Sequence, residues 1–395
     1  MIVVIPSFNE PDILTSLISL YNADRPTSPV EVIIVVNSPE GAGPNLLNQN
    51  NKTIHDVRDW SRSKNSDTFN VHVIDTPAFP RRYAGAGFAR KTGMDEAVQR
   101  FNMLNNENGI IVSFDADSIC DNNYFTELEK CFSVSGRRGC TIYFEHPLSG
   151  KGQSLVLYNA ITEYELFLRY FVQGMRLAGF PWSFHTIGSC FAVNVKTYAS
   201  QGGMNRKTAG EDFYFLHKIF PLGNFTELNT TRVVPSSRVS DRVPFGTGAT
   251  MKKFASGIQS TINTYPLKSF DQLAELLSKV PEFFRADETA TRGIINLLNP
   301  CIGEYLLRSG FIPAADQMNS HSASLPSFKK RFFAWFNAFR VIKYLNHARD
   351  NCIENQPVVM ASKDLLERYR IPSKKNSEAL LNTYRELQRK TIWKC

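Results

Sequence analysis

The sequence lacks most features that mark secreted, membrane-spanning or disulfide-rich proteins. Its seven cysteines are odd in number and widely spaced, and no C-x-x-C pair occurs. Such usage is typical of a reducing compartment, where free cysteines serve as small buried hydrophobic side chains. The first residues, M-I-V-V-I-P, lack a basic region and an extended apolar run, which predicts that no secretory signal is present. Because the longest apolar runs are too short and too charged to span a bilayer, we expect a cytoplasmic protein.

Motifs of nucleic-acid-binding proteins are also missing. There is no helix-turn-helix pattern, zinc-finger spacing or aromatic RNA-binding signature, so we expect no nucleic-acid partner. The formal net charge is +8, and the lysines and arginines are scattered rather than gathered in one tail. This balance favours anionic small molecules or an anionic surface as partners. With 395 residues, 43% of them hydrophobic, the chain is long enough for one catalytic domain plus an extension.

Short apolar runs alternate with helical patterns in the first half of the chain. Buried strands are predicted at residues 2–5, 31–36, 71–75 and 110–114. Helices are predicted after the first strand and from the glycine turn G-A-G-F-A-R-K-T-G, whereas the Gly-, Pro- and Asn-rich stretch 38–52 is expected to be loop. This alternation implies a parallel sheet with right-handed crossovers, whose ligands bind at the carboxyl ends of the strands.

Two aspartates, Asp115 and Asp117, follow the strand at residues 110–114. Neighbouring carboxylates are ligands that Mg²⁺ or Mn²⁺ prefers, and such an ion bridges the phosphates of a nucleoside diphosphate and stabilises its charge as a leaving group. By itself the pair has an equally good structural interpretation, because Asp117 or Asp121 can cap the helix that starts near Asn122.

Three segments in the order expected of one enzyme family give this pair its context. They are I-P-S-F-N at residues 5–9, A-R-K-T-G at 89–93 and D-A-D at 115–117. In order and spacing they resemble the family 2 glycosyltransferases of the GT-A fold, over roughly residues 1–248. The resemblance implies an α/β GT-A domain at residues 1–250, Rossmann-like, with a mostly parallel central sheet flanked by helices. The composition predicts a mainly α-helical region at 251–395.

The resemblance also implies which residues hold a nucleotide-sugar donor with a uracil or guanine base. These are Pro6, Phe8, Glu10, Asn37, Asp75, Arg90 and Asp115. Asp115 and Asp117 are the implied metal ligands. Two departures from the family pattern are Asn37, where an aspartate is usual, and Lys91, where an asparagine is usual. An amide also hydrogen-bonds a ribose hydroxyl or a base edge. The departure at Asn37 therefore leaves the identity of the donor's base undetermined, but it does not argue against transferase activity.

A second constellation surrounds the pair Glu211 and Asp212, which follows the glycines Gly202 and Gly203. It resembles the acceptor side of the family, and Asp212 is our candidate general base for transfer with inversion, with Glu211 beside it. We expect the N-terminus of their helix to keep both carboxylates ionised. The alternative is that they are ordinary first-turn acids. His217 is either a core residue or the third metal ligand, and the core role is the commoner one. His146 and His185 are other candidates for the third ligand, which we leave unassigned.

The segment 234–248 carries Arg238 and Arg242 together with Gly246 and Gly248. One interpretation is a loop that folds over the diphosphate, in which the arginines supply charge and the glycines supply hinge freedom. The other is a turn at Asp241–Arg242 that merely links domains.

Beyond Thr250 the sequence is helical in pattern. Helices are predicted at residues 273–280, 293–307, 328–344 and 363–369, separated by prolines. An aromatic stripe with flanking lysines and arginines lies within residues 328–345. It either contacts the inner face of an anionic membrane, docks on the catalytic domain or closes an acceptor site, and docking is the commonest fate of such a stripe.

Two functional hypotheses follow. The first is a hexosyltransferase-like, metal-dependent glycosyltransferase that moves a sugar from a UDP- or GDP-sugar to a carbohydrate, lipid-linked or small-molecule hydroxyl. The second is a catalytically inactive nucleotide-sugar-binding or scaffold protein of the same fold, which Asn37, Lys91 and the missing third metal ligand would fit. Nucleotidyl transfer is disfavoured, because S-F-N-E-P lacks the glycine-rich loop with a basic residue that such enzymes place after the first strand.

Overall fold

The computed structural model describes residues 1–148, 154–207, 210–239, 246–372, 374 and 376–390. The chain divides into two compact units that exchange segments. The first contains Met1–Ile161, Phe184–Gln259 and a segment beginning at Arg385, and the second contains Thr162–Ser183 and Ser260–Tyr384. The division into domains at residue 250 stays a prediction.

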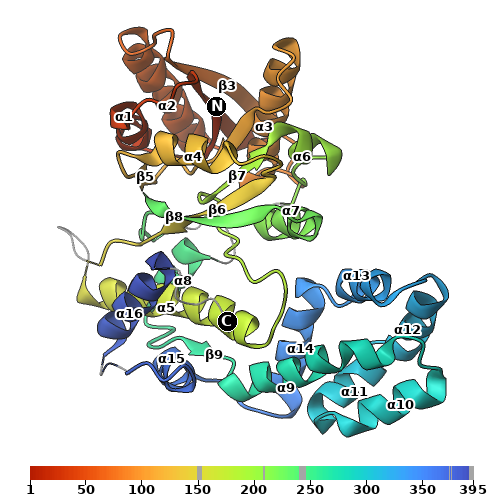
Figure 1. Ribbon diagram of the computed structural model, residues 1–395. Coiled ribbons are helices and arrows are strands. Elements are labelled where there is room, and N and C mark those ends of the chain that lie inside the picture. Colours follow the sequence, from red (N-terminus) through yellow and green to blue (C-terminus); the bar gives the residue numbers. More distant parts are fainter. Residues whose placement is uncertain (149–153, 208–209, 240–245, 373, 375, 391–395) are drawn as a thin grey trace. The chain divides into compact units, whose positions relative to one another are not determined.

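An eight-stranded sheet, in the order β3-β2-β1-β4-β7-β6-β8-β5, forms the first unit (Figure 1). The strands are β1 (Ile2–Ser7), β2 (Val30–Pro39), β3 (Phe69–Phe79), β4 (Ile110–Ser113), β5 (Ile119–Cys120), β6 (Gly139–Phe144), β7 (Phe191–Asn194) and β8 (Phe225–Val234). Strands β3, β2, β1 and β4 run parallel to one another, and β6 runs parallel to β8. Strand β7 runs antiparallel to β4 and β6, and β5 runs antiparallel to β8.

The centre of this sheet is apolar on both faces. Ile2–Ile5 of β1 and Val32–Val36 of β2 are almost completely buried. Such strands need helices on both faces, which right-handed crossovers provide. They place α1 (Ile13–Asn22) and α2 (Pro44–Arg62) on one face and α3 (Ala86–Met103) on the other. The predicted α/β class with a mostly parallel sheet flanked by helices is confirmed.

Two local expectations in this unit are wrong. Helix α2 begins at Pro44, inside the stretch expected to be loop. Proline is well tolerated in the first helical turn, and the buried side chains of Asn50, Ile54 and Val57 follow a helical spacing that the polar composition concealed. Strand β3 continues to Phe79 rather than ending near residue 75. Further helices of the unit are α4 (Tyr124–Phe132), α6 (Val195–Ser200), α7 (Glu211–Ile219) and α8 (Thr247–Ala255).

The end of the chain completes the first unit at β6 and β8. Helix α16 (Ser377–Arg389) ends there, where Arg389 Nη2 lies 3.3 Å from Oε1 of Glu145. Arg385 donates a hydrogen bond to the carbonyl of His146, and Asn229 of β8 donates one to the carbonyl of Gln388. Residues more than a hundred positions apart in the sequence thus hold this part of the unit together.

The second unit is mainly helical, as the sequence predicts for this region. Its helices are α9 (Leu267–Lys279), α10 (Glu288–Leu297), α11 (Pro300–Arg308), α12 (Phe311–Ser320), α13 (Leu325–Trp335), α14 (Ala338–Asn351) and α15 (Val358–Arg368). Helix α5 (Leu155–Leu177) runs from the first unit into the second, and β9 (Asn263–Thr264) pairs with β10 (Gln356–Pro357). Two of the predicted helices are each divided, because Asn299 and Asn337 cap new helices with their side chains.

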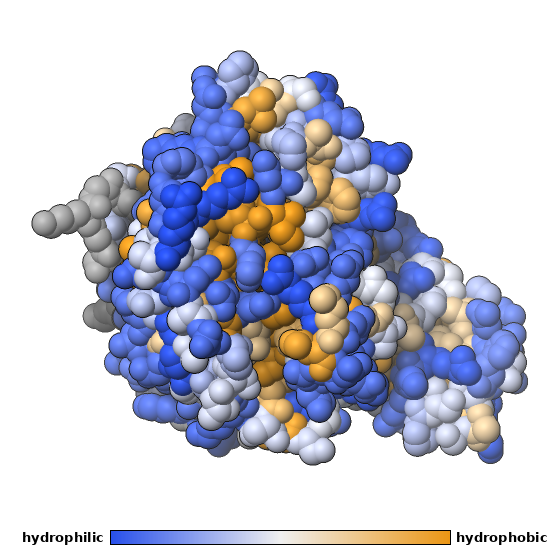
Figure 2. All heavy atoms as spheres, turned by 90° about the horizontal axis from the view of Figure 1, so that it is seen from above, coloured by the Kyte–Doolittle hydropathy of each residue, from blue (hydrophilic) through white to orange (hydrophobic). Residues whose placement is uncertain are grey.

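The aromatic stripe of residues 328–345 belongs to the core of its own unit. Phe328, Phe332 and Phe336 are fully buried, and Phe332 packs edge-on against Phe311 with ring centroids 6.0 Å apart. Membrane contact by this segment stays a prediction, which the burial of these rings does not support. No helix in the described part of the chain is long and apolar enough to cross a bilayer. Figure 2 shows hydrophilic side chains over most of the face that it views, around smaller hydrophobic areas.

Two cysteines of the second unit form a disulfide, so the expectation that the cysteines are free is wrong for this pair. Cys301, in the first turn of α11, is bonded to Cys352, which directly follows α14. The two lie 51 residues apart in the sequence. No short spacing pattern signals such a pair, because only the packing of α11 against α14 brings the cysteines together. Free cysteines of the described chain are Cys120, Cys131, Cys140 and Cys190.

Reduction of this disulfide is expected to lower the free energy of unfolding of the helical unit by about 2–4 kcal/mol, because the cross-link restricts the unfolded chain. Calorimetric unfolding with and without dithiothreitol measures the effect. The Cys301→Ser/Cys352→Ser variant should unfold at the lower temperature under both conditions, while Cys120→Ser should keep the sensitivity to reductant. Identical wild-type midpoints with and without reductant would contradict the prediction.

Candidate active site

The order of the strands reverses between β1 and β4, and predicted site residues follow both strands. Glu10 comes after β1, and Asp115 and Asp117 come after β4. In open α/β sheets, ligands bind in the crevice beyond the carboxyl ends of the strands at such a reversal. The fold therefore places these carboxylates where a ligand site is expected.

Arg90 joins the carboxylates of two different segments. It lies in α3 and its side chain is 3% exposed. Its Nη2 lies 3.1 Å from Oδ1 of Asp115 and 3.3 Å from Oε1 of Glu211 at the start of α7, and its Nη1 donates to Oγ of Ser113 at 3.1 Å. Burial alone would lower the pKa of this guanidinium, but the charges of Asp115, Glu211 and Asp212 raise it above its ordinary value. Arg90 is therefore a permanent buried cation between the end of β4 and the start of α7.

The absence of a side chain at Gly188 leaves room for the guanidinium of Arg90. A Cβ atom at this position would lie 2.6 Å from Nη2 of Arg90 and 3.5 Å from Oδ2 of Asp212. The carbonyl of Gly188 also accepts a 2.6 Å hydrogen bond from Oγ of Ser113. Neither Ser113 nor Gly188 was among the predicted site residues. Gly188 stands in the T-I-G-S-C segment just before β7, where a lone glycine gives no sign that an arginine packs against it.

Asp212 lies in the first turn of α7, and its carboxylate accepts a 2.7 Å hydrogen bond from the N–H of Phe213. Burial raises the pKa of Asp212 to about 7, helped by Glu211 and opposed by Arg90. The expectation that the helix N-terminus keeps this carboxylate ionised is wrong for Asp212, because burial and the neighbouring carboxylates outweigh the helix dipole. A carboxylate with a pKa near the working pH is suited to accept a proton.

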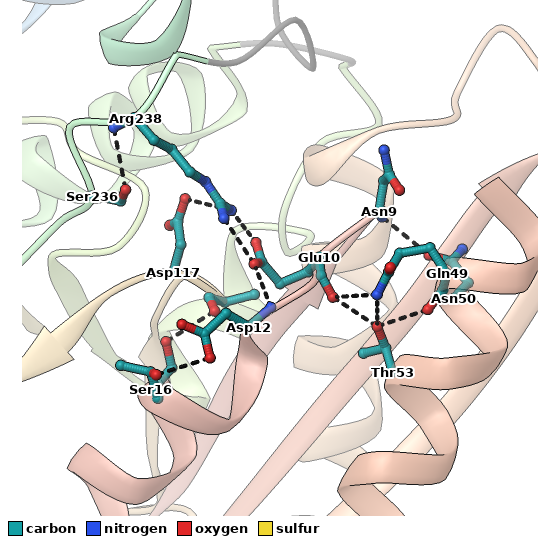
Figure 3. Close-up of polar contacts among 12 residues, drawn as sticks. Asn9, Glu10, Asp12, Ser16, Gln49, Asn50, Thr53, Asp117, Ser236 and Arg238 are labelled. Carbon is teal, nitrogen blue, oxygen red and sulfur yellow. Dashed lines mark hydrogen bonds and ion pairs between the residues drawn. The ribbon is translucent and has the colours of Figure 1, made fainter. Parts of the chain in front are cut away.

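A second ion-pair cluster lies around Arg238 (Figure 3). Nη1 of Arg238 donates to Oε1 of Glu10 at 2.9 Å, and Nη2 donates to Oε2 of the same carboxylate. The same Nη2 lies 2.9 Å from Oδ2 of Asp117. Burial would lower the pKa of Arg238, but Glu10 and Asp117 raise it. The structure thus brings together three residues that the sequence analysis assigned to donor or metal, from the segments after β1, β4 and β8.

The chemistry of Asp115 and Asp117 fits a divalent cation. Their side chains are 34% and 28% exposed, and two carboxylates completed by substrate phosphates and water are a usual ligand set for Mg²⁺. No third protein ligand joins them among the described residues, where the only geometric group of three is Cys301, His347 and Cys352, two of which are bonded to each other in the disulfide.

His217 has the surroundings of a core residue. Its ring packs against Phe213 and Phe220, with centroids 4.4 and 5.0 Å apart. Burial lowers the pKa of His217 to about 3, so the ring is neutral at physiological pH. These contacts favour the core interpretation over the metal-ligand one.

Buried polar atoms lie at the carboxyl ends of β1 and β2. The side-chain amide of Asn37 donates a 2.8 Å hydrogen bond to the backbone carbonyl of Ser7. The backbone carbonyl of Asn37 accepts one from the side-chain amide of Asn50. Oδ1 of Asn37 and the Oγ of Ser7 are buried and have no hydrogen-bond partner within the described residues. Unpartnered buried acceptors are costly, and their place beside the ligand crevice fits the prediction that Asn37 contacts the donor.

The remaining predicted residues are more dispersed. Pro6 and Phe8 are partly exposed around the end of β1. Asp75 is exposed within β3, in register with Val36 of β2. Arg242 lies outside the described residues, so the structure places only Arg238 of the two predicted loop arginines.

Comparisons with known proteins add little to this geometry. No protein-family model matches the sequence, and no curated protein does either. Among solved structures, the chain is similar to S. aureus TarS 1-349 in complex with UDP-GlcNAc, with 13% identity and a TM-score of 0.41 over 99% of this chain and 91% of that one. It is also similar to GalNAc-T7 with UDP, GalNAc and Mn²⁺, with 14% identity and a TM-score of 0.38 over 65% of this chain and 47% of that one. Values this low carry no weight for function, which the site itself must support.

The raised pKa of Asp212 makes stability depend on pH. Its ordinary pKa is 3.8 and its folded value is about 7, so the folded state favours the protonated form. Its contribution to stability is complete below pH 3.8 and is lost as the pH rises through 7. We therefore expect Asp212→Asn to match the wild type in thermal midpoint at pH 3.5 and to exceed it at pH 8. The exposed substitution Asp67→Asn is the control. A midpoint difference for Asp212→Asn that does not grow with pH would show that the carboxyl titrates normally.

Proposed function

We propose that the protein is a glycosyltransferase that moves a sugar from a UDP- or GDP-sugar to an acceptor hydroxyl. The carrying observation is the position of Arg90, which joins Asp115 at the end of β4 to Glu211 beside Asp212 at the start of α7. Asp115, which is suited to hold a metal-bound diphosphate, and Asp212, which is suited to take a proton, thus both lie near the guanidinium of Arg90. The motif order I-P-S-F-N, A-R-K-T-G and D-A-D supports the same assignment.

In this proposal the donor lies beyond the ends of β1, β2 and β4. Asp115 and Asp117 hold Mg²⁺ or Mn²⁺, which when bound supplies positive charge to the departing diphosphate. Arg90 orients Asp115 and keeps its charge balanced, because its guanidinium is buried and permanently protonated. Asn37 offers its amide oxygen to the nucleoside. Arg238 lies close to the metal ligands of this proposal, with Nη2 2.9 Å from Oδ2 of Asp117.

Asp212 acts as the general base. Its carboxylate takes the proton of the acceptor hydroxyl while the hydroxyl oxygen forms a bond to the anomeric carbon, and the bond from that carbon to the diphosphate oxygen breaks with its electron pair. The N–H of Phe213 orients the carboxylate. Attack from the face opposite the leaving group inverts the anomeric configuration. The acceptor is a carbohydrate, a lipid-linked sugar or a small molecule.

A nucleotide-sugar-binding protein without turnover is the second candidate. It is favoured by Lys91, which lies in α3 where the family pattern has an asparagine and pairs with Asp95 at 2.8 Å. It is also favoured by Asp117, which pairs with an arginine in the structure. Retained nucleotide binding without sugar transfer would identify this candidate.

Donor binding is the first test of the proposal. In thermal-shift measurements with Mn²⁺ and a panel of UDP-, GDP- and dTDP-sugars, a ligand at ~100 times its Kd should stabilise the wild type by about 2.7 kcal/mol. Asp117→Ala should lose this stabilisation, and so should wild type with EDTA, whereas Asp67→Ala should keep it. If no member of the panel stabilises the wild type, the nucleotide-sugar assignment is wrong.

Loss of the general base should affect turnover and leave donor binding intact. We expect Asp212→Asn to lower kcat by roughly 10²–10⁴-fold, the usual contribution of a general base, while the thermal shift with donor stays unchanged. In the wild type, kcat/KM should rise with pH through about 7, where Asp212 loses its proton. NMR of the product reports its anomeric configuration. A product with the configuration of the donor would exclude the inverting mechanism, and a pH-independent kcat/KM would exclude Asp212 as the base.

A further inference from the structure

Two loops that lead into the helices of the candidate active site meet beside it. One loop precedes α3, the helix of Arg90, and the other precedes α7, the helix of Asp212. A Cβ on Gly87, in the first turn of α3, would lie 2.0 Å from the carbonyl oxygen of Lys207 in the second loop and 3.0 Å from Cβ of Glu211, the first residue of α7. The second loop is tied to its helix, because Nδ2 of Asn205 donates a 3.0 Å hydrogen bond to the carbonyl of Glu211. Asn205 and Lys207 therefore lie beside the first turns of α3 and α7.

The described residues of the two loops include four exposed cations. Arg81 donates a hydrogen bond to the carbonyl of Glu40, and the other three, Arg82, Arg206 and Lys207, form what we call the cationic lip. None of the three has an ion-pair partner among the residues that the structure describes. Arg90, in contrast, is buried and paired with two carboxylates. The cationic lip thus carries charge that no carboxylate of the described residues neutralises.

Aromatic rings lie under the cationic lip and hold its side chains in place. The guanidinium of Arg206 lies 5.6 Å from the ring centroids of both Tyr83 and Phe88, and that of Arg82 lies 4.6 Å from Tyr83. Nζ of Lys207 lies 3.9 Å from the ring centroid of Tyr214. Contacts of this kind order cations without neutralising them. Aromatic faces with ordered cations form a surface that suits an anionic group carried on a sugar ring.

We infer that the cationic lip binds the acceptor, and that the acceptor is an anionic sugar bearing a phosphate or a carboxylate near the hydroxyl that is glycosylated. This inference rests on the proposed function and narrows its acceptor to one chemical class. Lys207 stands five positions before Asp212 in the sequence, at the entrance to the same helix. A sugar whose hydroxyl lies at Asp212 would bring a charged substituent within reach of the lip. A positive net charge of the whole chain, +8, adds to the attraction.

Binding of small probes to the full chain tests the inference. Glucose 6-phosphate, glucuronate and neutral glucose are titrated by NMR at low salt against wild type, the Arg206→Gln/Lys207→Gln variant and the Lys218→Gln control. Lys218 is exposed on α7, away from the loop, so its variant makes the same type of change outside the lip. We expect at least one anionic sugar to bind the wild type, with a Kd raised about tenfold or more in the double variant and unchanged in the control. Glucose should bind much more weakly.

Each outcome decides between the alternatives. If only glucose 6-phosphate binds, the anionic group of the acceptor is a phosphate, and if only glucuronate binds, it is a carboxylate. Either result supports the inference, and so does binding of both probes. Equal affinity for glucose, equal affinity in the double variant, or no binding of either anion overturns it. The thermal shift with UDP- or GDP-sugar separates this from the proposed function, because the double variant should keep that shift. If it loses the shift while the control keeps it, the lip serves the donor diphosphate and the acceptor assignment fails.

Discussion

The candidate active site depends on one buried cation. Arg90 is 3% exposed and is neutralised by Asp115 and Glu211, which come from segments nearly a hundred residues apart. Removing one partner of a buried ion pair costs about 3–5 kcal/mol, because the remaining charge stays in a medium of low polarity. The two carboxylates are therefore constrained to lie together. Their meeting also leaves Asp212 in a crowded, partly buried position, which raises its pKa to about 7.

The ion pairs of Arg238 with Glu10 and Asp117 follow the same principle. The Glu10 side chain is fully buried, and the guanidinium of Arg238 donates to both of its carboxylate oxygens. Arg238 in turn contacts Asp117. The segment after β8 is thus connected to the segments after β1 and β4. Because Arg238 contacts both carboxylates, a change in the charge of Asp117 alters the electrostatic balance at Glu10.

Much of this arrangement could be predicted from local patterns. The apolar runs that became β1, β2 and β4 are continuous and bounded by polar residues, and the positions of Asp115, Asp117 and Arg90 followed from them and from the motif order. Long-range partners could not be predicted. The pairing of Glu10 with Arg238 joins residues 228 positions apart, Gly188 matters only because Arg90 packs against it, and the Cys301–Cys352 bond depends on helix packing. The pKa of Asp212 also depends on burial, which its position at a helix N-terminus does not reveal.

The exchange of segments between the two units has a consequence for synthesis on the ribosome. The first unit includes a segment beginning at Arg385, where Arg389 contacts Glu145 and Asn229 contacts Gln388. Domains usually fold in order as the chain emerges, N-terminal first. Here the segment that begins at Arg385 is synthesised only after the helical unit. Until then, the part of the sheet that this segment contacts stays uncovered. A chain that stops anywhere before residue 385 would leave this part of the first unit without its partner, even if the parallel strands β1 to β4 had already formed.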